Sequence, residues 1–113
     1  YLGTPSGSGA PSGSLPPTAE TLELTAEAIA FDKKTLEAPA DEPFGIDFVQ
    51  KDSGVGGHNV EIRDSSGTSL FKGAVLTDPG ETTYVVSPLA AGTYTFICTV
   101  HPIPNMTGTL TVK

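Results

Sequence analysis

Four side chains of this sequence could together bind a transition metal: His58, Cys98, His101 and Met106. They are the chain's only cysteine, its only two histidines and its only methionine, and three of them fall within nine positions. One thiolate, two imidazoles and one thioether form the mixed soft and borderline donor set that suits a copper ion cycling between two oxidation states. The residue types and their spacing therefore predict a site for one copper ion.

Each donor also has an ordinary structural explanation. Cys98 could be a buried core thiol and Met106 could fill the core, while His58 could be a core histidine with a hydrogen-bond partner. A single cysteine cannot form an intrachain disulfide. The close spacing of Cys98, His101 and Met106 favours the metal site over these explanations.

The donors must be positioned by β-strands, because no helical periodicity is sustained over three turns. Short β-prone runs separated by turn residues indicate an all-β domain of about eight strands, which suggests a sandwich or a small barrel. The expected strands are 22–28, 33–37, 44–50, 58–64, 69–72, 82–86, 93–98 and 108–112.

Strand periodicity predicts which side chains face inward, since residues two apart share a face. Cys98 shares a face with Phe96, next to the polar Thr95, and His58 shares a face with Ile62. Both donors are therefore expected to face the core.

The loop between the last two strands carries His101 and leads to Met106. Pro102 and Pro104 restrict its backbone. If the strand that begins at His58 lies beside these two strands, one end of the sandwich could hold all four donors.

The composition of the chain indicates how it is divided into segments and which class of partner it would avoid. Residues 1–19 carry no charged side chain and are rich in Gly, Ser and Pro, which predicts a flexible tether to a membrane anchor or another domain. Residues 20–113 are expected to form the folded domain. The net charge of −7 argues against nucleic acid as a partner.

The sequence resembles the cupredoxins, most closely the plastocyanin and halocyanin-like small blue copper proteins. The resemblance rests on GHNV at 57–60, GTYTFIC at 92–98, the spacing of Cys98, His101 and Met106, and GTLTV at 108–112. It covers roughly residues 22–113 and implies a cupredoxin-like Greek-key β-sandwich. It also implies that His58, Cys98 and His101 are the trigonal ligands of a type 1 copper ion and that Met106 is the long axial ligand.

The resemblance further implies a supporting role for Asn59, whose hydrogen bonds would join the two ligand-bearing segments. His101 would lie in an apolar patch to which Pro102, Ile103 and Pro104 could contribute, and through which the electron leaves. The expected partners are redox proteins such as a cytochrome or a membrane oxidoreductase, in an extracytoplasmic setting, either the periplasm or the cell surface. The loop with its paired prolines differs from the more glycine-rich loop common in plastocyanins.

These observations predict a one-electron carrier that uses a type 1 copper centre and is not an enzyme. Two alternatives remain open, namely a copper-binding domain for delivery or storage, and a metal-free β-sandwich that acts as an interaction module. With one cysteine the chain cannot build a two-thiolate binuclear copper centre. It also contains no recognisable Ser/His/Asp arrangement for catalysis.

Overall fold

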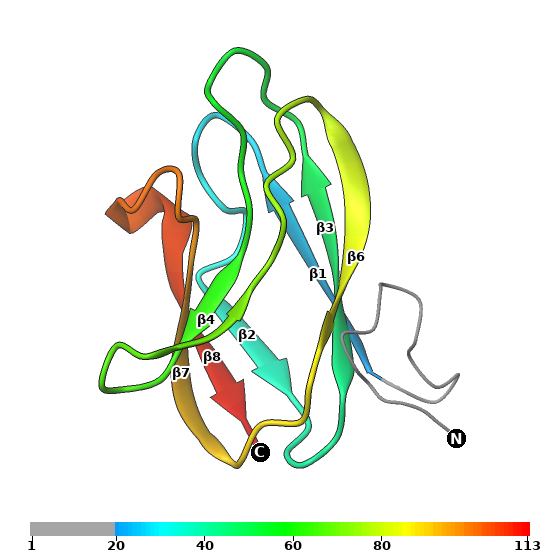
Figure 1. Ribbon diagram of the computed structural model, residues 1–113, viewed down its shortest axis with the longest axis vertical. Coiled ribbons are helices and arrows are strands. Elements are labelled where there is room, and N and C mark those ends of the chain that lie inside the picture. The colour runs from blue at the N-terminus through cyan, green and yellow to red at the C-terminus, as the bar shows by residue number, and fades with distance from the viewer. Residues whose placement is uncertain (1–19) are drawn as a thin grey trace.

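The computed structural model describes residues 20–113, which form two β-sheets that face each other (Figure 1). The three-stranded sheet has the order β1 (Thr21–Ala26), β3 (Phe44–Gln50) and β6 (Gly80–Val86). The five-stranded sheet has the order β2 (Thr35–Ala38), β8 (Thr107–Val112), β7 (Gly92–Ile97), β4 (Glu61–Arg63) and β5 (Ser69–Lys72). The expected all-β sandwich of eight strands is confirmed. The predicted tether, residues 1–19, lies outside the described residues.

Both sheets are mixed. In the three-stranded sheet β1 pairs parallel and β6 pairs antiparallel with the central β3. In the five-stranded sheet β2 pairs parallel with β8, and the β7–β8, β4–β7 and β4–β5 pairs are antiparallel. The β7–β8 pair matters most for function, because its connection carries three of the four predicted donors.

The core lies between the sheets and is built from alternate residues of the strands. Leu22, Leu24 and Ala26 of β1 are buried, whereas the residues between them are exposed or half-buried. Phe31 packs between the layers, with its ring centroid 5.5 Å from that of Phe96 and 6.4 Å from that of Phe48. Burial of a side chain of this size contributes roughly 1.5–3 kcal/mol, so these contacts hold the ends of β3 and β7 together.

Some predicted strand boundaries were wrong for identifiable reasons. The strand expected at 58–64 contains only Glu61–Arg63 as ladder, and His58 instead forms an isolated bridge with Leu76. The strand expected at 22–28 ends at Ala26, because Ala28 and Ile29 both have positive φ angles, 57° and 54°. The strand expected at 33–37 begins two residues later, at Thr35.

Three segments far apart in the sequence meet at one end of the sandwich, the upper end in Figure 1. They are residues 27–32 after β1, residues 51–60 between β3 and β4, and residues 98–106 between β7 and β8. Backbone and side-chain hydrogen bonds connect each of them to another, for example Phe31 N to Asn105 O at 2.9 Å. This end of the molecule holds the predicted donors.

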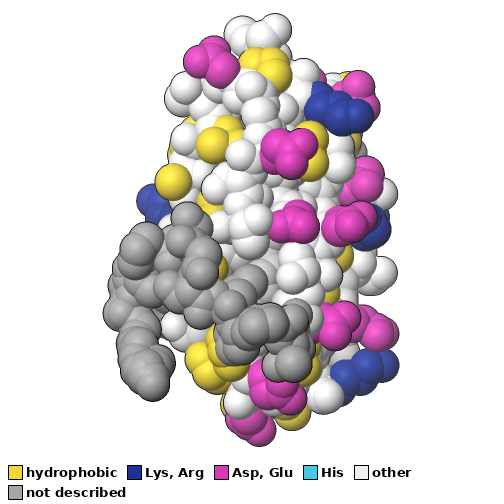
Figure 2. All heavy atoms as spheres, turned by 90° about the vertical axis from the view of Figure 1, so that its right-hand side faces the viewer, with side chains coloured by type: hydrophobic (Ala, Val, Ile, Leu, Met, Phe, Trp, Pro, Cys, Tyr) yellow, Lys and Arg dark blue, Asp and Glu magenta, His cyan; other side chains and the backbone are white. Residues whose placement is uncertain are grey.

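Acidic side chains are spread over the side that carries the three-stranded sheet, and no histidine is among the side chains seen there (Figure 2). Within residues 20–113, no helix has the length and apolar character required to cross a bilayer.

Candidate metal centre

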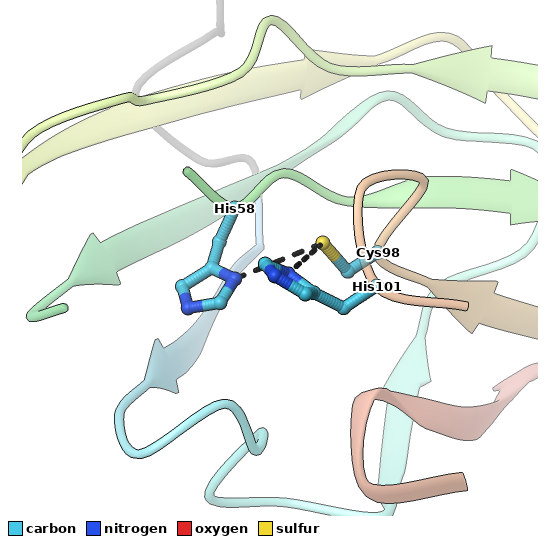
Figure 3. Close-up of side chains that lie close together, drawn as sticks. All are labelled: His58, Cys98 and His101. Atoms are coloured by element: carbon cyan, nitrogen blue, oxygen red, sulfur yellow. Dashed lines mark hydrogen bonds between the residues drawn. The ribbon is translucent and has the colours of Figure 1, made fainter. Parts of the chain in front are cut away.

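His58, Cys98 and His101 converge at this end of the sandwich (Figure 3). The Sγ of Cys98 lies 3.8 Å from Nδ1 of His58 and 3.9 Å from Nδ1 of His101. The three ligand atoms all lie within 4.8 Å of one another. His58 and Cys98 are fully buried, while His101 is half-buried, so only one donor residue reaches the surface.

The spacing of these atoms fits one small metal ion. A sulfur at about 2.3 Å and a nitrogen at about 2.0 Å from an ion, seen at about 115°, would lie roughly 3.7 Å apart. The observed separations of 3.8 and 3.9 Å are close to that value. A thiolate and two imidazoles are also the donors of the trigonal plane in type 1 copper sites. The residues present therefore fit a copper ion of this type.

Cys98 and Met106 are fixed to each other through the backbone. Cys98 follows β7 directly, and its N–H donates to the carbonyl of Met106 at 3.1 Å. Met106 ends a short 3₁₀ helix (Pro104–Met106) and is fully buried, whereas the residues 102–105 before it are exposed. The backbone of Met106 thus lies beside that of Cys98, and its side chain is shielded from solvent.

The loop that carries His101 is closed by its own hydrogen bonds. Ile103 N donates to His101 O at 2.7 Å, and Met106 N donates to Ile103 O at 2.9 Å. Lys34 adds a bond from outside, from its Nζ to the carbonyl of Pro104 at 2.6 Å. With two prolines in the loop, few backbone torsions remain free to move.

His58 is held by a bridge to a distant segment. Its N–H donates to Leu76 O at 3.1 Å, and its carbonyl accepts from Leu76 N at 2.9 Å. The preceding Gly57 has a φ of +100°, and a Cβ there would lie 2.7 Å from both Leu76 O and Val75 Cγ1. Only glycine fits this conformation and this close approach, so Gly57 is required for the backbone to reach the site.

Asn59 joins the two donor-bearing segments. Its Nδ2 donates to Gly73 O at 2.9 Å, and its Oδ1 accepts from Thr99 N at 2.8 Å and from Thr99 Oγ1 at 3.0 Å. The residue is fully buried. These bonds tie the neighbour of His58 to the neighbour of Cys98.

The alternation of apolar and polar residues predicted that His58 and Cys98 face inward, but it did not predict that polar residues on the other face of the His58 segment are buried too. Asn59 and Glu61 lie opposite the His58 face in the sequence pattern, yet both are buried. Asn59 is buried by the hydrogen bonds just described. Glu61 is paired with Arg63, whose Nη2 lies 2.6 Å from its Oε1.

Sequence reasoning missed a polar group behind His58. Oδ2 of Asp52 lies 2.7 Å from Nε2 of His58, the ring nitrogen opposite the one that faces Cys98. The hydrogen bond with His58, together with backbone N–H groups of Ile29 and Ala28, lowers the pKa of the Asp52 carboxyl below its ordinary value. Nothing in the sequence sets Asp52 apart from the other twelve acidic residues, because its neighbours 28 and 29 are distant in the chain.

The surface around His101 is apolar. Val100 and Ile103 are the large hydrophobic residues exposed here, at 37% and 40%, and Pro102 and Pro104 are exposed beside them. We refer to these four residues as the apolar patch. The space next to Gly56 is occupied by Val100, whose Cγ1 would lie 3.5 Å from a Cβ at that position. The patch therefore adjoins the glycine-rich segment that leads to His58.

Comparisons with known proteins agree with the fold described above. A family model described as a cupredoxin-like domain matches residues 10–112. No curated protein sequence matches the chain. Several solved structures do, and the matches cover most of both chains.

Three of these structures are auracyanins. Dithionite-reduced auracyanin from the photosynthetic bacterium Roseiflexus castenholzii has 22% identity and a TM-score of 0.70, over 84% of this chain and 98% of that one. Auracyanin B has 25% identity and a TM-score of 0.71, over 84% and 89%. Auracyanin A, described as a "blue" copper protein from the green thermophilic bacterium Chloroflexus aurantiacus, has 24% identity and a TM-score of 0.70, over 82% and 98%.

Proposed function

Because the chain belongs to the cupredoxin-like family, we propose that it is a one-electron carrier with a single type 1 copper centre. The observation that carries the proposal is the convergence of one thiolate and two imidazoles, with their ligand atoms within 4.8 Å of one another. Copper held by these donors exchanges one electron between Cu(I) and Cu(II).

In this proposal Nδ1 of His58, Sγ of Cys98 and Nδ1 of His101 form the trigonal plane. Met106 supplies the weak axial donor, supported by its burial and by the backbone bond between Met106 and Cys98. Asn59 acts on the site indirectly, because its bonds to Thr99 and Gly73 hold the two donor-bearing segments together. Such outer contacts keep the donors in place when the charge of the site changes.

Burial of the donors favours electron transfer over copper delivery. His58, Cys98 and Met106 are fully buried, so a receiving protein could not reach them without opening the fold. A delivery site needs accessible ligands that can be exchanged, whereas an electron needs only one ligand near the surface. Half-buried His101 meets the second requirement.

The apolar patch around His101 is the proposed docking site for a redox protein. Val100 and Ile103 expose 37% and 40% of their surface close to the one donor that reaches the surface. A cytochrome or a membrane oxidoreductase with a matching apolar surface would approach His101 directly. The chain's net charge of −7 favours a partner that is neutral or basic over an acidic one.

Localisation and attachment form a further part of the proposal. Residues 20–113 act as the copper-binding domain and residues 1–19 as a tether, supported by the uncharged, Gly/Ser/Pro-rich composition of that segment. An extracytoplasmic setting, the periplasm or the cell surface, is expected for a small blue copper protein. A membrane anchor joined through the tether would keep the carrier near a membrane-bound partner.

A redox titration tests this function. Copper-loaded protein is reduced and reoxidised stepwise while its visible absorption is followed, and one electron per chain is expected in both directions. Cys98→Ser serves as the control, since it removes the thiolate while leaving both histidines. A site that binds copper but cannot be reduced and reoxidised reversibly would contradict electron transfer and favour storage.

A further inference from the structure

We infer that Asp52 is a positioning residue for the copper site: it fixes the ring of His58 and places a negative charge behind it. The inference rests on the proposed function, because it concerns how His58 presents Nδ1 to the metal. The evidence consists of the contacts of Asp52, its burial and the backbone that holds it.

Asp52 is bonded on both carboxylate oxygens. Oδ1 accepts from Ala28 N at 2.8 Å, and Oδ2 accepts from Ile29 N at 2.8 Å. Oδ2 also lies 2.7 Å from Nε2 of His58. The side chains of His58 and Asp52 are only 0% and 14% exposed, so water competes little for these bonds.

The bond to Asp52 determines which nitrogen of His58 is available to a metal. The carboxylate of Asp52 accepts hydrogen bonds from two backbone N–H groups and, when ionised, has no proton to donate. In the bond between Asp52 and His58, the ring must therefore donate from Nε2. In the neutral imidazole Nδ1, on the side of Cys98, then carries the free lone pair and can act as a ligand. A carboxylate on the second nitrogen also makes an imidazole a stronger donor, as in other carboxylate–histidine–metal arrangements.

The backbone that holds Asp52 is strained. Ala28 and Ile29 are consecutive non-glycine residues in the left-handed region, with φ of 57° and 54°. Such conformations are unfavourable for non-glycine residues and persist where the surrounding structure fixes them. Both residues turn their N–H groups toward Asp52, and a carboxylate that accepts two such bonds can offset much of this cost.

The strained segment also contacts the loop between β7 and β8, which carries His101 and Met106. Phe31 N donates to Asn105 O at 2.9 Å, immediately before Met106 in the chain. The segment 27–31 therefore braces the His58 side through Asp52 and the Met106 side through Asn105. A change at Asp52 is expected to alter the position of His58 first, because the bond to Nε2 is direct.

Copper-free protein gives the first test. In mildly alkaline buffer, proton NMR of wild-type protein should show the Nε2–H of His58 far downfield, as expected for a short hydrogen bond to a carboxylate. Asp52→Ala should abolish this signal. Asp52→Asn should keep a weaker one, because its Oδ1 can still accept from His58 and Ile29, whereas Nδ2 cannot accept the bond from Ala28 N.

Asp64→Asn is the matched control. The carboxylate of Asp64 accepts backbone bonds from Ser66 and Thr68, both at 2.9 Å, but lies in the β4–β5 turn, away from His58. This variant removes one negative charge and should leave the His58 signal unchanged. A His58 signal in Asp52→Ala identical to that of the wild type would overturn the inference, whether or not the protein binds copper.

Copper-loaded protein gives the second test. Chelator competition should show copper(II) affinity lowered about 10- to 100-fold in Asp52→Ala. The reduction potential should rise in both Asp52 variants, because a nearby negative charge stabilises Cu(II) over Cu(I), and Asp64→Asn should keep the wild-type value. Unchanged potentials in both Asp52 variants would overturn the inference while leaving the copper site itself established.

Discussion

At the scale of single residues, hydrogen bonds outside the donor cluster hold Cys98 and His58 in place. Cys98 is held by the bond from its N–H to Met106 O, and His58 by its bridge to Leu76 and its contact with Asp52. These hydrogen bonds restrict the movement of Cys98 and His58. Donors held in this way would shift little between the two oxidation states of a bound copper ion, which suits rapid electron exchange.

Met106→Leu tests the axial donor. The swap nearly conserves volume and should cost less than about 1.5 kcal/mol of stability. Loss of the thioether should leave a coloured site with a raised reduction potential, because a weak donor to the oxidised ion is removed. Met106→Gln is the matched control, since an oxygen donor at the same position should lower the potential. Equal potentials for wild type, Leu and Gln would contradict axial ligation.

Asn59→Ala tests the link between the donor-bearing segments. The change leaves Gly73 O and Thr99 N without their partners, at roughly 1–3 kcal/mol for each buried group. The free energy of unfolding of the copper-free protein, measured by denaturant titration, should fall accordingly. Replacement of the exposed Asn105 by alanine should have a small effect. If both variants unfold at the wild-type midpoint, Asn59 does not stabilise the site.

The residue types predicted which side chains could be metal donors, but they could not predict which other groups hold those donors in place. Cys98, His101 and Met106 are close in the chain, and His58 is the only other histidine, so the chemistry was readable from composition. Asp52 was not, because its role depends on a contact with residues 28 and 29, more than twenty positions away. Long-range hydrogen bonds of this kind leave no periodic signal in a sequence.

At the scale of elements, the connection between β7 and β8 does most of the positioning. It places Cys98, His101 and Met106 within one short loop, closed by the 3₁₀ helix. Two strands, β3 and β5, have the expected bounds. β4 was predicted too long, because His58 pairs with Leu76 in an isolated bridge instead of continuing the pairing of β4 with its neighbouring strands. Strand propensity does not show with which segment a residue pairs.

Gly108→Ala tests the packing of β8 against β7. A Cβ at Gly108 would overlap Cζ of Phe96 and lie 2.6 Å from Lys34 O, so a buried ring or the backbone must move. Overpacking of this kind should lower the free energy of unfolding by about 1–3 kcal/mol.

Gly80→Ala in β6 is the matched control, because its nearest neighbour would be Asp78 O at 3.9 Å. In thermal unfolding without copper, the melting temperature of Gly108→Ala should be clearly lower than that of Gly80→Ala. Equal melting temperatures for the two would show that β7 and β8 pack less tightly at Phe96 than the structure indicates.

At the scale of the whole molecule, the metal centre and the apolar patch lie at one end of the sandwich. Both termini of the described chain lie at the opposite end (Figure 1). A tether attached at residue 20 would thus leave the docking end free to meet a partner. The sequence predicted that the donors and the apolar patch lie at one end of the sandwich, but alternation along the strands could not predict where the chain termini lie relative to them.

Deletion of residues 1–18 tests the proposed division of the chain. Pairing in the described structure begins at Thr21 with Gly45, and Gly45 N donates to Glu20 O at 2.9 Å. The shortened protein should therefore fold, bind copper and keep its melting temperature. A large fall in melting temperature would show that the segment belongs to the folded domain.

The most direct test of the copper site is an optical spectrum of the purified protein after addition of copper(II), repeated after a reductant. An intense band toward the red end of the spectrum should appear, bleach on reduction and return on reoxidation, because it arises from the bond between the Cys98 thiolate and Cu(II). Cys98→Ser should lack the band. A colourless wild-type protein with a titratable free thiol, or a band that survives in Cys98→Ser, would contradict the type 1 assignment.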